Sequence, residues 1–307
     1  MTATIIDGKA LGTKVREEVA ASVAELGHVG LATVLVGDDP ASHIYIDLKQ
    51  KAAQQAGMEA RDLKLPSRTS EEALLATIAE LNADDAVDGL LVQLPLPDHI
   101  DENRVIEAIA PAKDVDGIHP INAGRLYLGR PSLVPGTPLG IMRMLDEYEI
   151  PLEGARAVVV GRSAIVGKPM AHLLLRRNAT VTICHSRTRD LPSVTRQADI
   201  LVVAIGRAGF IRSNHIKPGA TVIDVGMNQV ADEAVARSLF GDDLERRLQI
   251  IAKRGYTLVG DVNAAEADEI AGRRTPVPGG VGLLTVAMLM SNTLKAARLR
   301  RGLQDDQ

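Results

Sequence analysis

One stretch near the middle of the chain constrains the fold more than any other. Residues 157–160 are four consecutive apolar residues, typical of a buried strand, and a glycine-bounded turn over 161–167 follows them. A helix is predicted from Pro169, because proline suits a first helical turn, where its missing N–H would have no partner. Strand, turn and helix N-terminus together attract phosphate through free amides and the helix dipole. The turn is Gly-x-Ser-x-x-x-Gly rather than Gly-x-Gly-x-x-Gly, so a βα turn without a ligand is an alternative.

Strands and helices alternate on both sides of this stretch. Before it, strands are predicted at 31–36, 60–65 and 88–93, with helices over 10–26, 42–56, 70–82 and 102–109. After it, strands are predicted at 179–184, 200–205, 221–225 and 257–260, with helices over 169–177, 190–197 and 285–300. This alternation predicts an α/β fold with mainly parallel sheets, and 307 residues suffice for two domains.

Three segments do not follow the alternation. Residues 111–138 are rich in turn residues and lack periodicity, and so long an irregular segment is usually functional. Thr137 is expected to cap a helix that reaches Tyr148. Residues 232–253 are highly charged and are predicted to form a surface insertion, while 275–282 are predicted to form a rigid, kinked loop.

Composition excludes several classes of function. The net charge of −4 favours neither nucleic acid nor an acidic membrane surface as a partner. We expect no signal peptide and no membrane anchor, because the first residues lack a basic stretch before an apolar core and no apolar run approaches the length of a membrane span. The single cysteine, Cys184, cannot form an internal disulfide, which fits a structural residue in a cytoplasmic protein.

Tyr45 and Lys49 are candidate catalytic residues. They are four residues apart in the predicted helix 42–56 and therefore share one face. This helix follows a buried strand, where α/β sheets place their ligands, and Tyr45 is one of only four tyrosines. A lysine that is desolvated beside an aromatic ring has a lowered pKa, which suits proton transfer near neutral pH. The alternative is a surface helix whose lysine lays its stem along apolar neighbours.

Gln93 and Asp116 are candidate ligand-binding residues. Gln93 ends the predicted strand 88–93, so its amide is placed to contact a ligand. Asp116 lies in the irregular segment, and a carboxylate can accept two parallel hydrogen bonds from a flat N–H/NH₂ edge such as that of a 2-aminopyrimidinone. An ordinary loop glutamine and a turn aspartate before Gly117 are the alternatives.

The residues after the predicted strand 179–184 indicate the cofactor. NAD-binding folds usually place an acidic residue there for the ribose hydroxyls, whereas this chain continues with His185, Ser186 and Arg187. Ser186, Arg187 and Arg162 suit a 2′-phosphate instead, which favours NADP, and plain surface arginines are the alternative. The histidines show no ligand spacing with cysteine or carboxylates, so no metal site is expected.

Together the motifs resemble the bifunctional methylenetetrahydrofolate dehydrogenase/cyclohydrolases. The matching stretches follow the order of that family and cover nearly the whole chain. They are Ser42-x-x-Tyr45-x-x-x-Lys49, Gly89-Leu-Leu-Val-Gln93-Leu-Pro-Leu-Pro97, Lys113-Asp-Val-Asp-Gly117, Gly161-Arg-Ser-x-Ile-Val-Gly167, Ala179-Thr-Val-Thr-x-Cys-His-Ser186, Val222-Ile-Asp-Val-Gly226 and Thr275-Pro-Val-Pro-Gly-Gly-Val-Gly282.

The resemblance implies two domains and two reactions. An N-terminal α/β catalytic domain over 1–147 would be completed by a returning C-terminal helix over 283–307, and a Rossmann-like NADP-binding domain would span 148–282. Hydride would pass from the methylene bridge of 5,10-methylenetetrahydrofolate to NADP, and water would open 5,10-methenyltetrahydrofolate to 10-formyltetrahydrofolate. The resemblance further implies a homodimer that serves one-carbon metabolism, including purine and formyl-methionine synthesis.

The resemblance also implies roles for individual residues. Lys49 looks like the catalytic lysine, Tyr45 like the ring that stacks on the substrate, Gln93 like the amide that supports Lys49, and Asp116 like the pterin-binding carboxylate. Further substrate contacts are implied at Pro278 and Gly279. Cofactor contacts are implied at Gly161, Arg162, Ser163, Ile165, Ser186, Arg187 and Met227, the last of which is usually isoleucine in the family.

The chain departs from the family's pattern in three places. Gly136 stands where the family usually has cysteine, Leu283 and Leu284 replace Pro-Met after Gly282, and the segment 232–253 is unusually long. The first two departures keep open a dehydrogenase with little cyclohydrolase activity. An NADP-binding sensor that has lost catalysis is a second alternative, against which the joint retention of the four catalytic candidates argues.

Overall fold

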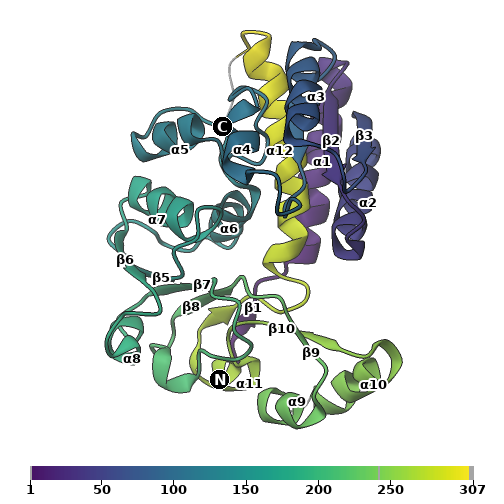
Figure 1. The fold of residues 1–307 in the computed structure, drawn as a ribbon. Helices are drawn as coiled ribbons and strands as arrows, with labels where there is room; N and C mark the ends of the chain where they lie inside the picture. Colours follow the sequence, from purple (N-terminus) through teal and green to yellow (C-terminus); the bar gives the residue numbers. More distant parts are fainter. Residues whose placement is uncertain (1, 241–242, 304–307) are drawn as a thin grey trace. The chain divides into compact units, whose positions relative to one another are not determined.

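A computed structural model describes residues 2–240 and 243–303, which form two compact units (Figure 1). The first unit comprises Gly12–Gly136 and Thr285–Gln307, and the second comprises Met1–Leu11 and Thr137–Leu284. These units differ from the expected domains, because residues 1–11, 137–147 and 283–284 pack with the second unit. The boundaries of the functional domains therefore stay a prediction.

The first unit is built on a parallel sheet of three strands in the order β3–β2–β4. The strands are β2 (Gly30–Val36), β3 (Glu59–Leu65) and β4 (Gly89–Val92). Gly30 pairs with Glu59 on one side of β2, and Leu31 pairs with Gly89 on the other. Every residue of β2 is buried, which explains why all its residues except Thr33 are apolar or glycine, whereas β3 at the edge has exposed and half-buried residues.

Among the described residues, six helices lie wholly or mainly in the first unit, and two of them, α1 and α12, also extend into the second. They are α1 (Gly8–Leu26), α2 (Pro40–Gln55), α3 (Glu71–Ala83), α4 (Glu102–Ala108), α5 (Pro120–Tyr127) and α12 (Val281–Arg300). Helix α2 starts two residues before the prediction because the Asp39 carboxylate caps it, accepting from the Ser42 N–H at 2.8 Å. Among the described residues no helix is long and apolar enough to cross a membrane.

The segment 111–138 differs from the prediction. It is not wholly irregular, because it contains α5. The Asp114 carboxylate accepts from the His119 N–H at 2.8 Å and from Asn122 Nδ2 at 2.9 Å, which fixes the start of this helix. Lys113 is buried, and its Nζ donates to three carbonyl groups at the end of α3, those of Leu81, Asn82 and Asp84. A helix held by such buried polar contacts carries little apolar periodicity, so the pattern missed it.

Helix α12 returns the chain to the first unit, where it lies beside α1 (Figure 1). Arg300 Nη1 donates to Asp88 Oδ1 at 2.8 Å and Arg301 Nη2 to Asp88 Oδ2 at 3.2 Å, at the start of β4. Asn292, which is buried, donates to the carbonyl groups of Val115 at 2.7 Å and Val134 at 2.8 Å. The last helix therefore fixes both a strand and the segment that carries Asp116.

The second unit contains a parallel six-stranded sheet in the order β1–β11–β8–β7–β5–β6. The strands are β1 (Thr4–Ile5), β5 (Arg156–Val160), β6 (Thr180–Cys184), β7 (Ile200–Val203), β8 (Thr221–Asp224) and β11 (Arg273–Arg274). The helices of this unit include α6 (Gly136–Glu147), α7 (Gly167–Arg176), α8 (Leu191–Thr195) and α11 (Ala264–Ile270), with a 3₁₀ turn over Ser213–His215. Since β6 and β7 flank β5 on opposite sides, the strand order reverses at β5.

Two short strands at one edge of this sheet escaped the sequence analysis. Thr4 pairs with Arg273 and Ile5 with Arg274, and β11 in turn pairs with β8. Two residues are too few to show an alternation. This pairing draws the first residues of the chain into the second unit.

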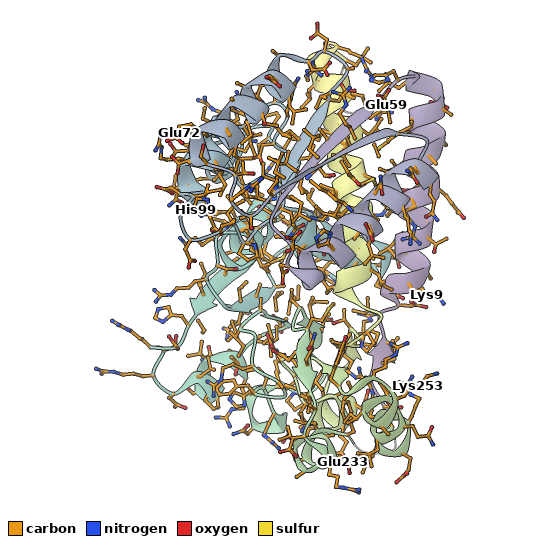
Figure 2. The ribbon with its side chains drawn as sticks, turned by 45° about the vertical axis from the view of Figure 1, so that its right-hand side comes forward. Lys9, Glu59, Glu72, His99, Glu233 and Lys253 are labelled. Carbon is orange, nitrogen blue, oxygen red and sulfur yellow. The ribbon has the colours of Figure 1, made fainter. Side chains whose placement is uncertain are left out.

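The predicted strand at 257–260 forms, but outside the parallel sheet. It is β10 (Thr257–Val259), which pairs antiparallel with β9 (Asn228–Val230). Between them lie α9 (Glu233–Leu239) and α10 (Leu244–Arg254), where the labelled Glu233 and Lys253 are found in Figure 2. The charged segment thus consists largely of two helices, with a small core made by Val230, Ala236, Leu239, Ile251 and Val259.

Candidate active site

The first unit brings two of the predicted catalytic side chains into contact. Lys49 on α2 donates a hydrogen bond from Nζ to Gln93 Oε1 at 3.0 Å. Gln93 follows β4 directly, and its main-chain N–H donates to Val34 O at 2.8 Å, which holds it at the carboxyl end of the sheet. Gln93 Nε2 donates to Leu94 O at 2.7 Å, so the amide oxygen is left facing the amine.

Asp116 lies beside the same strand end. The residue Leu90 of β4 bridges in parallel to Asp114, and its N–H donates to Lys113 O at 2.7 Å. Asp116 follows two residues later in a turn, where its carboxylate is close enough to the Lys49 amine for the charges of the two groups to interact. In the described part of the chain, no donor is hydrogen-bonded to the Asp116 carboxylate, unlike that of Asp114. Asp116 therefore keeps both carboxylate oxygens available for a ligand.

Burial shifts the pKa values of Lys49 and Asp116 in opposite directions. It lowers the pKa of the Lys49 amine, and the negative charge of Asp116 only partly opposes this. It raises the pKa of the Asp116 carboxyl, against the attraction of Lys49, although the residue as a whole is only partly buried. Desolvation disfavours both charged forms, so each group is closer to exchanging a proton at neutral pH than its free counterpart.

Tyr45 is placed only through its backbone. It lies on α2 four residues before Lys49, on the same face of that helix. Its side chain lies outside the part of the structure that is described, so stacking on a substrate stays a prediction.

The second unit supplies the glycine turn between β5 and α7. Gly161 has φ +131°, and a Cβ there would collide with the carbonyl oxygen of Ala204, so only glycine fits. A Cβ at Gly167 would collide with Gly161 O. Ser163 Oγ accepts from the N–H groups of Val166 at 3.2 Å and Gly167 at 3.3 Å, and α7 begins at Gly167 rather than Pro169. The turn is thereby closed on itself with no side chain at either glycine.

The predicted phosphate-binding side chains follow neighbouring strands. Val160 of β5 pairs with Cys184 of β6, and Arg162 and Ser186 each come two residues later. Arg162, Ser186 and Arg187 are exposed, and in the described ranges neither guanidinium has a hydrogen-bond or ion-pair partner. Ile165 in the same turn is 54 % exposed. Two guanidinium groups without partners, which follow the carboxyl ends of β5 and β6, fit a cofactor that carries a 2′-phosphate.

The remaining predicted contacts lie on two other segments of the second unit. Met227 follows β8 and is 47 % exposed. Pro278 and Gly279 lie between β11 and α12, and Gly279 adopts φ +110°. Arg247 of α10 donates to Val277 O at 3.0 Å, so the charged insertion supports this loop.

Two buried carboxylates near the ends of β7 and β8 were not predicted. Asp224 accepts main-chain N–H bonds from Gly226, Asp261 and Val262 at 2.9, 2.9 and 3.0 Å, and burial raises its pKa to about 7. Asp261 accepts from the N–H groups of Ile205, Gly206 and Arg207. Apart from the family motif that begins Val222-Ile-Asp, the signal in the sequence was an acidic residue directly after an apolar run, which resembles an ordinary turn.

The described residues contain no cluster of histidine, cysteine and carboxylates that could hold a metal ion. A cavity of about 710 Å³ in the second unit is lined by Asp224, Phe240, Arg247 and the segment 275–278, so Pro278 is the only predicted site residue on its wall. The arginine–carboxylate pairs on its wall, such as Arg274 with Asp268, are satisfied by one another. We therefore locate the site by the strand ends and not by this cavity.

Comparison with known proteins places the chain in a family. Residues 6–116 match the family model described as tetrahydrofolate dehydrogenase/cyclohydrolase, catalytic domain, and 135–301 match its NAD(P)-binding domain. A relative from Koribacter versatilis, described as bifunctional protein FolD, is 53 % identical over 98 % of this chain and 99 % of its own. A relative from Phenylobacterium zucineum with the same description is 54 % identical over 99 % of this chain and 100 % of its own.

Solved structures agree with this assignment. The bifunctional enzyme FolD, a methylenetetrahydrofolate dehydrogenase/cyclohydrolase, from Campylobacter jejuni has a TM-score of 0.88 and 44 % identity, covering 97 % of this chain and 99 % of its own. The Trypanosoma brucei enzyme, solved with NADP and an inhibitor, has a TM-score of 0.87 and 38 % identity, covering 98 % and 99 %. The fold and the site define a two-unit α/β enzyme, and the chain belongs to the tetrahydrofolate dehydrogenase/cyclohydrolase family.

Proposed function

We propose that this chain oxidises 5,10-methylenetetrahydrofolate with NADP and then hydrolyses the 5,10-methenyltetrahydrofolate to 10-formyltetrahydrofolate. The observation that carries the proposal is the buried amine of Lys49, held by Gln93 at the strand end that Asp116 also reaches. The matches to both family domains support it. A sensor without catalysis would need neither this amine nor an unengaged carboxylate beside it.

For the oxidation, this chain has to position the folate. NADP, when bound, supplies the acceptor for the hydride that leaves the methylene carbon, and the folate becomes the methenyl cation. Asp116 would hold the substrate by accepting two parallel hydrogen bonds from the N–H/NH₂ edge of the pterin ring. Holding the reacting carbon in one orientation is the main contribution that a protein can make to hydride transfer.

For the hydrolysis, this chain has to remove a proton from water. The water oxygen bonds to the methenyl carbon, one of that carbon's two C–N bonds breaks, and one proton is released overall. Lys49 is the candidate base, because burial lowers the pKa of its amine and Gln93 directs it without an ion pair.

The second unit fits NADP on two observations. Gly161 and Gly167 have no side chains, so none stands between a phosphate and the start of α7, where Ser163 Oγ accepts from the N–H groups of Val166 and Gly167. Arg162 and Arg187 have no partner among the residues that the structure describes, which leaves both for a 2′-phosphate. We propose that Ser163, Ile165, Ser186 and Met227 complete the cofactor contacts and that Pro278 and Gly279 contact the folate.

One assay tests the proposal and its nearest alternative. Purified protein is mixed with NADP and 5,10-methylenetetrahydrofolate, and the methenyl absorbance is followed. The proposal expects this absorbance to rise and then to decay in an enzyme-dependent way. A rise without accelerated decay would identify a dehydrogenase with little cyclohydrolase activity, as the departures at Gly136 and Leu283-Leu284 allow, and no rise would overturn the proposal.

We also propose that the chain acts as a homodimer in the cytoplasm, with a catalytic domain over 1–147 and 283–307 and an NADP-binding domain over 148–282. The lone cysteine, Cys184, is buried and free, which fits a reducing compartment. Residues 304–307 lie outside the described residues. Sedimentation equilibrium at several protein concentrations tests the dimer, and a single monomeric mass at all of them would refute it.

A further inference from the structure

We propose that Asp261 is a positioning residue for the nicotinamide cofactor. It holds the turn 205–207 and the segment 226–228, which follow β7 and β8, in the arrangement that the cofactor site needs. This inference rests on the proposed NADP site. The Asp261 residue is completely buried, at 0 % exposure, so its carboxylate organises the protein from within rather than contacting a ligand itself.

Four donors converge on the Asp261 carboxylate. The N–H groups of Ile205 and Gly206 donate to Oδ2 at 2.7 and 3.0 Å, and that of Arg207 donates to Oδ1 at 2.7 Å. Asn228 Nδ2 also donates to Oδ1, at 2.9 Å. Any other conformation of the turn 205–207 would leave the buried side-chain oxygens of Asp261 without their donors, which is costly, so this side chain restricts the turn to one shape.

The restricted turn lies at the end of the sheet where a cofactor binds. The strand order reverses at β5, which has β7 as one neighbour, and open α/β sheets bind ligands outside the carboxyl ends of the strands at such a point. Ala204 directly precedes the turn, and its carbonyl oxygen lies against Gly161 so closely that no Cβ would fit. If the turn 205–207 moved, the Ala204 carbonyl group against which Gly161 packs would move with it.

The same carboxylate also holds the segment after β8. A Cβ at Gly226 would collide with the main-chain nitrogen and the carboxylate of Asp261, so the two residues fit only because position 226 is glycine. Met227 follows, and Asn228 is bonded to Asp261. Asp261 is itself fixed, because its N–H donates to Asp224 Oδ1 at 2.9 Å. One buried residue thus joins the carboxyl ends of the neighbouring strands β7 and β8, at the end of the sheet where the cofactor is proposed to bind.

The variant Asp261→Asn tests this role. It keeps the size of the side chain but replaces one acceptor oxygen with an NH₂ group that faces donors. The Kd for NADP, measured by calorimetry, is expected to rise about tenfold or more, as expected for the loss of hydrogen bonds to a charged group. Hydrolysis of 5,10-methenyltetrahydrofolate without nucleotide should stay within about twofold, since that reaction moves no hydride. Because Lys49, Gln93 and Asp116 lie in the first unit, a structural defect in the second unit has to be excluded by a separate control variant.

The control is Asp199→Asn in the same sheet. Asp199 Oδ2 also accepts a main-chain hydrogen bond, from the Arg156 N–H at 2.8 Å. This bond lies at the amino ends of the strands, whereas the cofactor is proposed to bind at their carboxyl ends. Its Kd for NADP should remain that of the wild type. An equal rise in both variants, a parallel loss of hydrolysis in Asp261→Asn, or a folded Asp261→Asn with unchanged NADP affinity would each overturn the inference.

A second variant keeps the test decisive if Asp261→Asn does not fold. Asn228→Ala removes a single donor from the same carboxylate, and it should still raise the Kd for NADP, whereas an unchanged Kd would overturn the inference. A wild-type protein that binds no NADP would instead overturn the proposed cofactor. Wild-type binding with an unaffected Asp261→Asn would overturn only the role of Asp261.

Discussion

The Lys49 amine donates to the side-chain oxygen of Gln93 across 3.0 Å, and its partner in this bond is neutral. A carboxylate in the place of Gln93 would stabilise the charged ammonium group and raise its pKa. The amide instead orients the amine while burial keeps the pKa of Lys49 below its usual range. The bond to Gln93 thus orients the amine, and the negative charge of Asp116 only partly opposes the effect of burial on its pKa.

Lys49→Met should separate the two proposed activities. Methionine keeps the length and the apolar stem of lysine but removes the amine. Hydrolysis of 5,10-methenyltetrahydrofolate should fall by at least about 10²-fold, the effect of a lost acid–base group. Dehydrogenation should fall less, because it depends mainly on positioning. Both rates are measured on one purified preparation whose folding has been checked by a thermal melt.

Lys51→Met is the matched control, because Lys51 lies on the same helix but is exposed. Its two activities should equal those of the wild type. A folded Lys49→Met protein with near-normal hydrolysis would refute the assignment of Lys49 as the base.

Asp116→Asn should weaken folate binding while NADP binding survives. The substitution turns one acceptor oxygen into a donor that faces the donors of the pterin edge. The expected cost is about 2–4 kcal/mol, from the lost charged hydrogen bonds and an unpaired group. Calorimetry with a folate and separately with NADP measures both affinities. An unchanged folate affinity would show that Asp116 is only a turn residue before Gly117.

The strands and the turns at their ends could be predicted from the sequence because their signals are local. The buried runs of β2, β5 and β7 and the glycine at 161 each determine their own conformation within a few residues. Lys49 and Gln93 could also be predicted as site residues. Lys49 lies on the helix after β2, Gln93 directly follows β4, and α/β sheets bind ligands at the carboxyl ends of their strands. The bond between them depends on tertiary packing, which the sequence could only suggest through the family resemblance.

The parts that were missed depend on contacts between distant residues. The strand β1 pairs with β11 across more than 260 residues of sequence, and each has only two residues. Asp224 and Asp261 are 37 residues apart, and each alone resembles a turn aspartate. Helix α5 is fixed by Asp114 and His119 rather than by an apolar stripe. No periodic pattern marks such polar, long-range contacts.

Arg162→Ala should weaken NADP binding far more than NAD binding. A well-formed bond between a guanidinium group and the 2′-phosphate contributes about 1.5–3 kcal/mol, and NAD lacks that phosphate. The Kd of each nucleotide is measured for the wild type, for Arg162→Ala and for Arg176→Ala, an exposed arginine at the far end of α7. An equal loss for both nucleotides, or a wild-type preference for NAD, would contradict the proposed cofactor.

Asn292→Ala should destabilise the first unit. It leaves the carbonyl groups of Val115 and Val134 without the donor that joins them, and each unsatisfied buried group costs about 1–3 kcal/mol. Folate affinity should also fall, because Val115 directly precedes Asp116. Urea unfolding measures the loss. Thr293→Val is the control, since its hydroxyl bonds only to Leu289 O within the helix; equal losses in the two variants would contradict this role of Asn292.

Asp224 should make the stability of the second unit depend on pH. Burial raises the pKa of its carboxyl from an ordinary 3.8 to about 7 in the folded protein. Between these values the folded protein retains a proton that the unfolded chain has released. Raising the pH therefore lowers the free energy of unfolding, by at most about 1.4 kcal/mol per pH unit, until the slope ends above the folded pKa.

The difference in unfolding free energy between the wild type and Asp224→Asn isolates this contribution, because the other titrating groups cancel. The variant cannot titrate at this position, so the wild type should lose stability relative to it from pH 5 upward, and the slope should fade between pH 7 and 8. Urea unfolding of both proteins at pH 5, 6, 7 and 8 measures the difference. Three main-chain N–H groups favour the charged carboxylate and oppose the effect of burial. A difference that is constant, or that grows with pH, would mean that these donors outweigh burial and keep Asp224 ionised.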